Sequence, residues 1–283
     1  MRVVTRKKGK SRYYYLQHSF RKNGKVVTRE LYLGKKVPSN IENIKAKLIH
    51  ESKEALVEKL EKIRTHFQEE MAKYPESAKE KELREIAIAF TYNTNAIEGS
   101  TVTLEETRQI LEDRVAPNKP LKEIRETESH AKVFLNMLKT NEAISEELLL
   151  KWHKDIFMET KPDVAGKLRN YLVRIGSYVP PDWHDVKKLL DQLIMFVNES
   201  RLNPVETAVR AHYIFERIHP FGDGNGRIGR LLMNYILWKN AYPMLIIEHR
   251  KRKTYYQALE RTEEGFTNYL IRRYISIHKK RSQ

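Results

Sequence analysis

The stretch His219-Pro220-Phe221-Gly222-Asp223-Gly224-Asn225-Gly226-Arg227-Ile228-Gly229-Arg230 carries the most chemical information in this chain. Within twelve residues it holds a histidine, a carboxylate, an amide, four glycines and two arginines. Glycines let backbone N–H groups approach an anion, arginines bind phosphate oxygens in a bidentate manner, a carboxylate can hold Mg²⁺, and a histidine can move a proton near neutral pH. These residue types predict a phosphate-binding site, with a solvated Gly-rich turn as the alternative.

Helical spacing on both sides places this stretch between two helices. The apolar residues that show the spacing are Ala211, Ile214, Phe215 and Ile218 upstream, and Leu231, Leu232, Tyr235, Ile236 and Trp238 downstream. A Gly-rich loop that leads into a helix directs unpaired N–H groups and the positive end of the helix dipole to one spot. The sequence therefore predicts an anion site at the start of the second helix.

Better-known loops that bind phosphate or calcium do not account for this stretch. Residues 224–229 spell the dinucleotide-binding G-x-G-x-x-G, which needs a buried strand before its first glycine, whereas a helical segment ending in His219-Pro220 stands there. The chain has no G-x-x-x-x-G-K-[ST] loop. Asp223-Gly224-Asn225 opens like a calcium loop, but the required glycine and the terminal glutamate are out of place.

The stretch resembles, position for position, the H-x-F-x-[DE]-G-N-G-R-x-x-R signature of Fic (Fido) domain proteins, which transfer AMP from ATP to hydroxyl groups of other proteins. The resemblance covers roughly residues 90–235 and implies a Fic-type helical bundle. It implies that His219 is the general base for the attacking hydroxyl and that Asp223 holds Mg²⁺ between the α- and β-phosphates.

The resemblance also implies a set of nucleotide-binding residues. Asn225 and the N–H groups around Gly224 and Gly226 are expected to stabilise charge that develops on the α-phosphate. Arg227 and Arg230 are expected to bind the β- and γ-phosphates, and their spacing at a helix start puts them on one face.

A second motif lies upstream. Thr94-Asn95-Ala96-Ile97-Glu98-Gly99 resembles the [ST]-x-x-x-E-[GN] inhibitory motif of Fic proteins that carry their inhibitory helix N-terminally. The helical stripe before it consists of Leu83, Ile86, Ala87, Phe90 and Ile97. Gly99 is expected just past the helix end. The resemblance implies that Thr94, Glu98 and Gly99 form the inhibitory segment, in which Glu98 pairs with Arg230 and holds ATP in a pose unsuited to attack.

A third segment, residues 166–181, resembles the target-binding flap of the same family. Its alternating pattern between Gly and Pro predicts a hairpin with a free edge that can pair with an extended peptide. The flap residues are Ile175, Gly176, Ser177, Tyr178 and Val179. A plain surface hairpin is the alternative interpretation.

Composition excludes several other classes of protein. The chain has no cysteine, which removes disulfides, thiolate zinc sites and cysteine nucleophiles. It shows no signal peptide and no apolar run long enough to span a membrane, so we expect a soluble, cytoplasmic protein without a membrane partner. The ten histidines lack a metal-ligand spacing such as H-E-x-x-H, and the metal ligand that the resemblance implies is Asp223.

Positive charge is concentrated at the ends of the chain. Residues 1–36 hold twelve Lys or Arg residues and one acidic residue, Glu30. Residues 13–20 and 25–33 have the composition of strands and flank Asn23-Gly24, which predicts a β-hairpin. Basic side chains and tyrosines together can contact nucleic acid through phosphates and stacking, whereas a purely solvated surface is the alternative.

From about residue 40 onward the pattern is helical, so the fold class is mainly α, with a short N-terminal β-hairpin module and a small β-hairpin flap. Besides the inhibitory helix, we predict helices over 41–71, 104–114, 121–138, 145–158, 186–197, 205–218, 227–238, 254–261 and 266–278. The expected organisation is a basic hairpin module (1–38), a helical connector (39–80), the inhibitory helix with the Fic core (81–240) and basic C-terminal helices (241–283).

The leading functional hypothesis is a protein adenylyltransferase that uses ATP and Mg²⁺, modifies a Ser, Thr or Tyr hydroxyl and is autoinhibited by Glu98. Removal of AMP, or another Fic-type phosphotransfer, is an alternative within the enzyme class. A nucleic-acid-binding or protein-binding regulator with an inactive core is the alternative from another class. The intact motif disfavours it. The residues do not identify the target protein. They also leave open whether the chain forms a homo-oligomer and whether the basic hairpin binds nucleic acid.

Overall fold

The computed structural model describes residues 1–9, 11–22 and 25–282. The chain divides into two compact units, Met1–Glu58 and Lys59–Gln283. The division falls within the segment predicted as a helical connector, inside the long helix α1 (Ile41–Lys73). The predicted Asn23-Gly24 turn lies outside the described residues.

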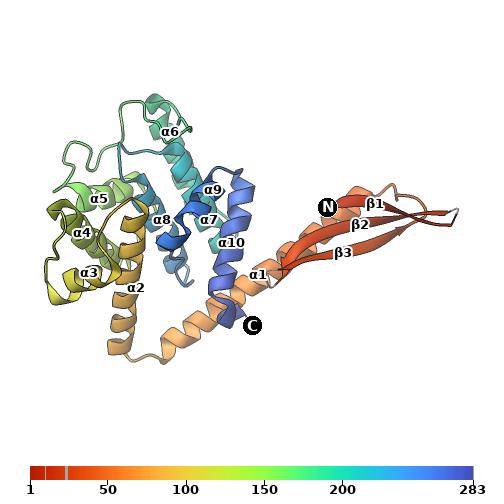
Figure 1. Ribbon diagram of the computed structural model, residues 1–283, viewed down its shortest axis with the longest axis horizontal. Coiled ribbons are helices and arrows are strands. Elements are labelled where there is room, and N and C mark those ends of the chain that lie inside the picture. The colour runs from red at the N-terminus through yellow and green to blue at the C-terminus, as the bar shows by residue number, and fades with distance from the viewer. Residues whose placement is uncertain (10, 23–24, 283) are drawn as a thin grey trace. The chain divides into compact units, whose positions relative to one another are not determined.

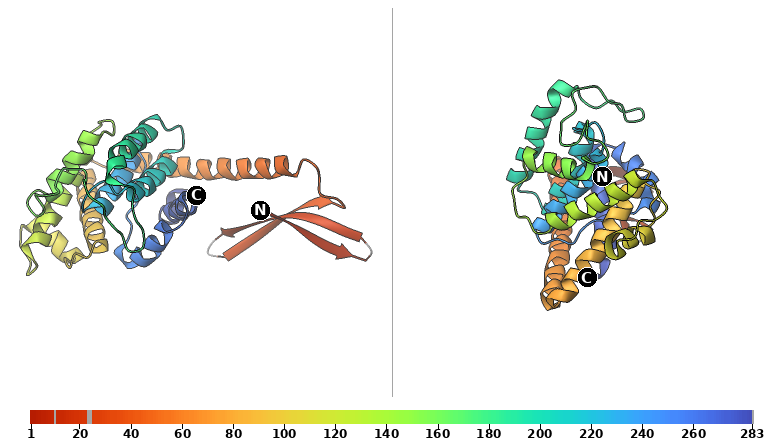
Figure 2. Two further views of the ribbon diagram at one scale, coloured as in Figure 1. Left: turned by 90° about the horizontal axis from the view of Figure 1, so that it is seen from above. Right: turned by 90° about the vertical axis from the view of Figure 1, so that its left-hand side faces the viewer.

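The first unit contains an antiparallel sheet of three strands in the order β1 (Arg2–Lys8), β2 (Ser11–Lys22) and β3 (Lys25–Gly34). The three strands lie side by side in Figure 2. Strands β2 and β3 correspond to the predicted hairpin, whereas β1 was not predicted. Its second half, Arg6-Lys7-Lys8, has the composition of a solvated charge cluster, and its extended state comes from pairing with β2.

The second unit is helical, which confirms the mainly α fold class. Its helices after α1 are α2 (Glu76–Ile97), α3 (Leu104–Arg108), α4 (Leu121–Met137), α5 (Glu146–Phe157), α6 (Trp183–Glu199), α7 (Pro204–Ile218), α8 (Asn225–Lys239), α9 (Arg252–Leu259) and α10 (Glu263–Ile277). Short 3₁₀ turns cover His249–Lys251 and Lys279–Ser282. Within the described residues, no helix combines the length and apolarity that crossing a membrane requires.

Local capping chemistry explains where several helices begin. Thr103 and Glu106 form a reciprocal capping box at the start of α3, and Ser145 caps α5. Asn203 caps α7, whose first residue is Pro204, the position where proline is best tolerated. The predicted helix 104–114 is interrupted, because α3 passes into a π-helical turn, Gln109–Asp113, which ends at Arg114 with a φ of 59°.

Helices α7 and α8 pack against each other in the middle of the helical unit (Figure 1). Phe215, Leu231 and Leu232, which the spacing placed on the apolar faces, are fully buried between the surrounding helices. Phe221, in the loop between α7 and α8, is also fully buried and anchors that loop in the core. The loop that contains Phe221 and Asp223 therefore connects two helices that pack against each other.

Candidate active site

His219 stands at the C-terminal cap of α7 and has left-handed backbone dihedral angles, with φ at 52° and ψ at 62°. A non-glycine residue seldom adopts this conformation, and such strain persists only when the surroundings impose it. The N–H group of His219 donates to the carbonyl of Phe215 at 2.9 Å, which ends the helix and turns the chain into the loop.

Arg169 holds the backbone around His219. Its guanidinium is buried and donates to four carbonyl oxygens: His219 at 2.8 Å, Ile218 at 3.4 Å, Tyr171 at 3.0 Å and Pro181 at 2.7 Å. Its backbone N–H also donates to Pro220 at 2.9 Å. Two of these acceptors are His219 and its neighbour, and the other two lie in the predicted flap segment on either side of its turn. One side chain therefore ties the histidine to both sides of that turn.

The surroundings of His219 shift the pKa of its imidazole. Burial lowers the pKa of His219 to about 4, although the Glu216 carbonyl opposes the shift. The side chain is therefore neutral at neutral pH and can accept a proton. A hydroxyl brought against it meets an unprotonated nitrogen without any prior deprotonation step.

The loop after His219 is held by its own residues. Gly224 has a φ of +77°, and a Cβ at this position would lie 2.4 Å from the Phe157 ring, so only glycine fits. The Asn225 amide accepts from the Phe221 N–H and donates to the Phe221 carbonyl, each at 2.8 Å. Each polar group of Asn225 therefore makes one bond within the loop, and its second amide N–H has capacity for a further acceptor.

Asp223 points one carboxylate oxygen at the start of α8 and the other at a lysine that sequence reasoning did not identify. Oδ1 accepts from the Gly224 N–H at 2.6 Å, and Oδ2 lies 2.7 Å from the Nζ of Lys161. Burial would raise the pKa of Asp223, but Lys161 lowers it below its usual range. The buried His153 donates from Nε2 to the Asp223 carbonyl at 2.9 Å, because its Nδ1 accepts from Gly166.

Arg227 is paired with a second carboxylate that the sequence did not reveal. Its guanidinium binds Glu126 of α4, and both side chains are largely buried. The Glu126 carboxylate also accepts from Thr160 at 3.0 Å and lies 3.4 Å from Lys161. Burial would raise the pKa of Glu126, but Arg227 lowers it. Arg227, Glu126, Lys161 and Asp223 therefore form one continuous chain of opposite charges.

Arg230 is paired with Glu98, the residue that the second motif singled out. Arg230 is 1% exposed, and its guanidinium donates to Glu98 Oε1 at 2.6 Å and to Thr94 Oγ1 at 2.7 Å. Burial would lower the pKa of Arg230, but the Glu98 carboxylate raises it above its usual range. A Cβ built on Gly226 would lie 2.2 Å from Glu98 Oε1. The carboxylate thus sits against the first turn of α8, where the loop was predicted to bind an anion.

The end of α2 holds Glu98 in place. Glu98 is the C-terminal cap of the helix, and Gly99 follows in the left-handed region with a φ of +96°. Tyr256 of α9 donates to the Ile97 carbonyl at 3.2 Å, and the His249 N–H donates to Asn93 at 2.8 Å. The C-terminal segment, which received no role from the sequence, therefore buttresses the helix that carries Glu98.

The predicted flap is a tight turn and not a regular hairpin. One antiparallel bridge closes it, with Ile175 and Tyr178 exchanging two backbone hydrogen bonds of 2.9 Å around Gly176 and Ser177. Ile175 and Val179 are exposed. The Tyr178 hydroxyl donates to the Arg217 carbonyl at 2.8 Å, which fastens the turn two residues before His219.

The residues present fit a divalent cation only if phosphate supplies most of its ligands. Asp223 offers an ionised carboxylate that is about half exposed. No group of three His, Asp or Glu side chains that could hold a metal occurs in the described part of the chain. An Mg²⁺ ion at Asp223 therefore needs nucleotide oxygens and water to complete its shell, and it competes with Lys161 for one oxygen.

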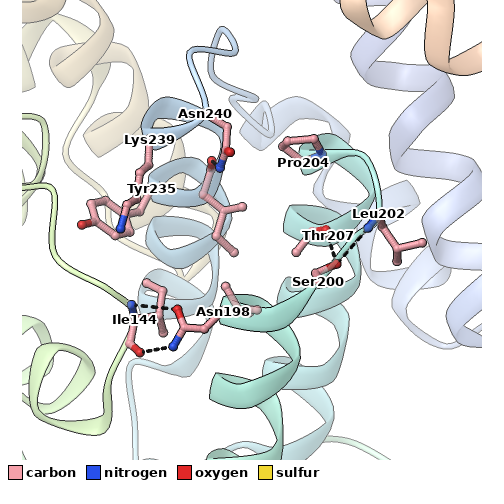
Figure 3. A pocket seen from close by; sticks show the side chains of 11 residues that line it. Ile144, Asn198, Ser200, Leu202, Pro204, Thr207, Tyr235, Lys239 and Asn240 are labelled. Atoms are coloured by element: carbon pink, nitrogen blue, oxygen red, sulfur yellow. Dashed lines mark hydrogen bonds between the residues drawn. The ribbon is translucent and has the colours of Figure 1, made fainter.

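A cavity of about 230 Å³ lies apart from this chemistry (Figure 3). Of the described residues that line it, none belongs to the stretch 219–230. Asn198 bonds the backbone of Ile144, and Ser200 bonds Thr207 and the N–H of Leu202. Its polar groups thus satisfy one another, so we do not assign this cavity to the active site.

The chain is similar in sequence to known proteins. Residues 143–237 match the model of the Fic/DOC family. The protein adenylyltransferase Fic of Nematostella vectensis is 33% identical over 198 residues, which cover 67% of this chain and 46% of that protein. The protein adenylyltransferase fic-1 of Caenorhabditis elegans is 33% identical over 209 residues, which cover 71% and 41%. The chain therefore spans less than half the length of these relatives.

Solved structures agree with the sequence comparison. The structure of Fic-1 (residues 134–508) from Caenorhabditis elegans superposes with a TM-score of 0.71 at 27% identity, covering 86% of this chain and 77% of that one. A Fic family protein from Desulfovibrio desulfuricans gives a TM-score of 0.66 at 26% identity, covering 80% of this chain and 73% of that one.

Proposed function

Because this chain carries a domain of the Fic/DOC family in residues 143–237, we propose that it is a protein adenylyltransferase, which transfers AMP from ATP to a Ser, Thr or Tyr hydroxyl of a target protein. In the resting chain Glu98 inhibits the reaction. The observation that carries the proposal is the position of the Glu98 carboxylate, which contacts both Arg230 and the first turn of α8.

A carboxylate in this position supports a nucleotide-phosphate site for a simple reason. The first turn of a helix presents unpaired N–H groups and partial positive charge, and a buried arginine next to it needs an anionic partner. Glu98 supplies that anion from α2, so it takes the place of a phosphate group of ATP. The γ-phosphate is the best candidate for displacement, because it carries the most charge and lies at the end of the nucleotide.

In the proposed reaction the hydroxyl oxygen of the target attacks the α-phosphorus of ATP. His219 takes the hydroxyl proton, the bond between the α-phosphorus and the bridging oxygen breaks, and pyrophosphate leaves with the bonding electrons. His219 suits this role because it is neutral at neutral pH and its backbone is fixed by Arg169. Mg²⁺ held at Asp223 would supply positive charge to the α- and β-phosphate oxygens.

The remaining motif residues hold this arrangement. Arg227 and Arg230 bind the outer phosphates once their carboxylate partners give way, and Asn225 keeps the loop in shape through Phe221. The exposed edge of the flap at Ile175 and Val179 receives an extended target segment by backbone pairing. Tyr178 links that edge to the last turn of α7, so a docked hydroxyl is placed near His219.

The test uses purified wild-type, Glu98→Gln, Glu98→Gly and Glu98→Gly/His219→Ala proteins with Mg²⁺, ATP labelled at the α-phosphate and a protein lysate as target source. We expect strong protein labelling with Glu98→Gly, weaker labelling with Glu98→Gln, and little with wild type or the double variant. Equal labelling by wild type and Glu98→Gly would remove the inhibitory role. Absence of label from every variant would contradict the transferase itself, and label from γ-labelled ATP would indicate phosphorylation instead.

A further inference from the structure

One face of the N-terminal sheet carries a cluster of tyrosine and arginine side chains, which we call the tyrosine face: Tyr13, Tyr15, Tyr32, Arg2 and Arg6. Residues paired across antiparallel strands point to the same side of a sheet. The register pairs Arg6 with Tyr13, pairs Tyr15 with Tyr32, and pairs Arg2 with Gln17. Alternation along each strand puts all five side chains on one side.

The ring of Tyr32 on β3 contacts the rings of Tyr13 and Tyr15 on β2. The Tyr15 and Tyr32 ring centroids are 5.2 Å apart, and those of Tyr13 and Tyr32 are 6.2 Å apart. Tyr32 is 53% exposed, although an aromatic side chain gains by burial. On the opposite side of β2, Leu16 is 1% exposed. The sheet therefore buries a residue on one side and presents aromatic surface on the other.

Positive charge borders these rings. The Arg6 guanidinium lies 5.2 Å from the Tyr15 centroid and also binds Glu30 at 2.7 Å, with 60% of its side chain exposed. Arg2 donates to Gln17 at 2.7 Å, which orients its guanidinium along the same face. Glu30 is the one acidic residue among residues 1–36, against twelve Lys or Arg residues. A partner that meets this surface gains most if it carries regularly spaced negative charge.

We propose that the tyrosine face binds single-stranded nucleic acid, with Arg2 and Arg6 contacting phosphates and the tyrosines stacking against unpaired bases. Charge alone would suit any polyanion. Three contacting rings on an open sheet face add stacking surface, and stacking on aromatic side chains is how sequence-tolerant proteins hold unpaired bases. This inference concerns the first unit and does not depend on the proposed AMP transfer by the second.

The experiment measures fluorescence anisotropy of a labelled DNA strand of about 20 nucleotides, titrated with the full chain at salt concentrations from about 50 to 200 mM. We expect the single strand to bind more tightly than a duplex of equal length. The logarithm of the binding constant should fall with the logarithm of salt concentration with a slope of about −1.4 or steeper, because each of the two arginine–phosphate contacts contributes roughly −0.7.

Three variants separate the two kinds of contact. Arg2→Gln/Arg6→Gln should make the salt slope shallower by about 1 to 1.5. Tyr32→Ala should weaken binding about tenfold with an unchanged slope. Lys279→Gln/Lys280→Gln removes the same charge from the C-terminal segment and should change neither the salt slope nor the binding affinity.

Several results would overturn the proposal. One is absence of binding at the lowest salt concentration. Another is an equal loss of DNA affinity in the Arg2/Arg6 and Lys279/Lys280 variants. A third is binding of an acidic polypeptide such as polyglutamate as tightly as the DNA strand. Tighter binding of the duplex than of the single strand would contradict stacking of the tyrosines against unpaired bases. Protein labelling by Glu98→Gly is measured separately, so failure here and failure of the adenylyltransferase proposal remain distinguishable.

Discussion

The Nε of Arg169 donates a hydrogen bond of 2.8 Å to the carbonyl oxygen of His219. The same guanidinium binds the carbonyl oxygens of Tyr171 and Pro181, which lie within the flap segment on either side of the Ile175–Tyr178 turn. Burial lowers the pKa of Arg169, and carbonyl oxygens supply all of its hydrogen-bond acceptors among the described residues. A buried cation of this kind fixes His219 relative to the segment that contains the Ile175–Tyr178 turn, because its bonds go to both.

Arg169→Lys should lower kcat for AMP transfer about 100-fold while leaving KM for ATP within about threefold, because a small displacement of a catalytic group costs that much and lysine cannot reach four acceptors. The measurement is steady-state labelling in the Glu98→Gly background, with the thermal midpoint recorded to confirm folding. Lys167→Arg, at an exposed lysine nearby, is the control. A rise in KM for ATP with kcat unchanged would contradict a positioning role.

Glu126→Gln should destabilise the folded chain by about 3–5 kcal/mol, because it leaves the buried guanidinium of Arg227 without its carboxylate. Glu159→Gln is the matched control, since Glu159 pairs with Arg125 at the surface and its loss should cost less than about 1 kcal/mol. Urea titration gives both free energies of unfolding. An equal decrease in the free energy of unfolding for the two variants would show that Glu126 does not stabilise Arg227.

Lys161→Met should lower the Mg²⁺ concentration that gives half-maximal AMP transfer about three- to tenfold, since Lys161 and the metal compete for Oδ2 of Asp223. The assay is Mg²⁺-dependent labelling in the Glu98→Gly background, with Lys154→Met as a control. A higher Mg²⁺ requirement would show instead that Lys161 helps to bind the nucleotide.

Acid should destabilise the protein well above the pH at which most carboxylates titrate. Burial lowers the pKa of five histidines to values of about 3 or 4: His130, His153, His212, His219 and His278. Between these values and about 6.5 the unfolded chain binds protons that the folded chain does not, so stability falls as pH drops through that window. Each histidine contributes up to about 1.4 kcal/mol per pH unit.

Glu216 partly offsets this effect. Burial raises its pKa to about 7, so the folded chain holds a proton there between about 4.5 and 7, which favours folding as pH falls. Because five buried histidines oppose folding at low pH and one glutamate favours it, the free energy of unfolding should be lower at pH 5 than at pH 7.5 by at least about 2 kcal/mol. Urea titrations at the two pH values measure this difference. His130→Gln should reduce this difference, whereas His184→Gln, at an exposed position, should leave it unchanged. Equal stability at the two pH values would refute the neutral, buried state of these histidines.

Most helices could be predicted from the sequence, because their apolar spacing and their caps are local properties. Thr103, Ser145 and Asn203 stand where a cap is needed and act as caps in the structure. Strand β1 could not be predicted in the same way, since pairing with β2 decides its state. The flap was expected as a hairpin and closes with a single bridge, while Arg169 and the Tyr178 hydroxyl bind it through long-range contacts that no local pattern encodes.

The sequence by itself determined the chemistry of the loop. A short motif carries the histidine, the carboxylate, the glycines and the arginines within twelve residues. The resemblance of the second motif implied that Glu98 pairs with Arg230, which lies 132 residues further along the chain. Only the tertiary structure decided that Arg227 is paired with Glu126, Asp223 with Lys161, and His219 with Arg169. The reason is physical. A buried charge takes whichever partner the packing brings within reach, and no local pattern records that choice.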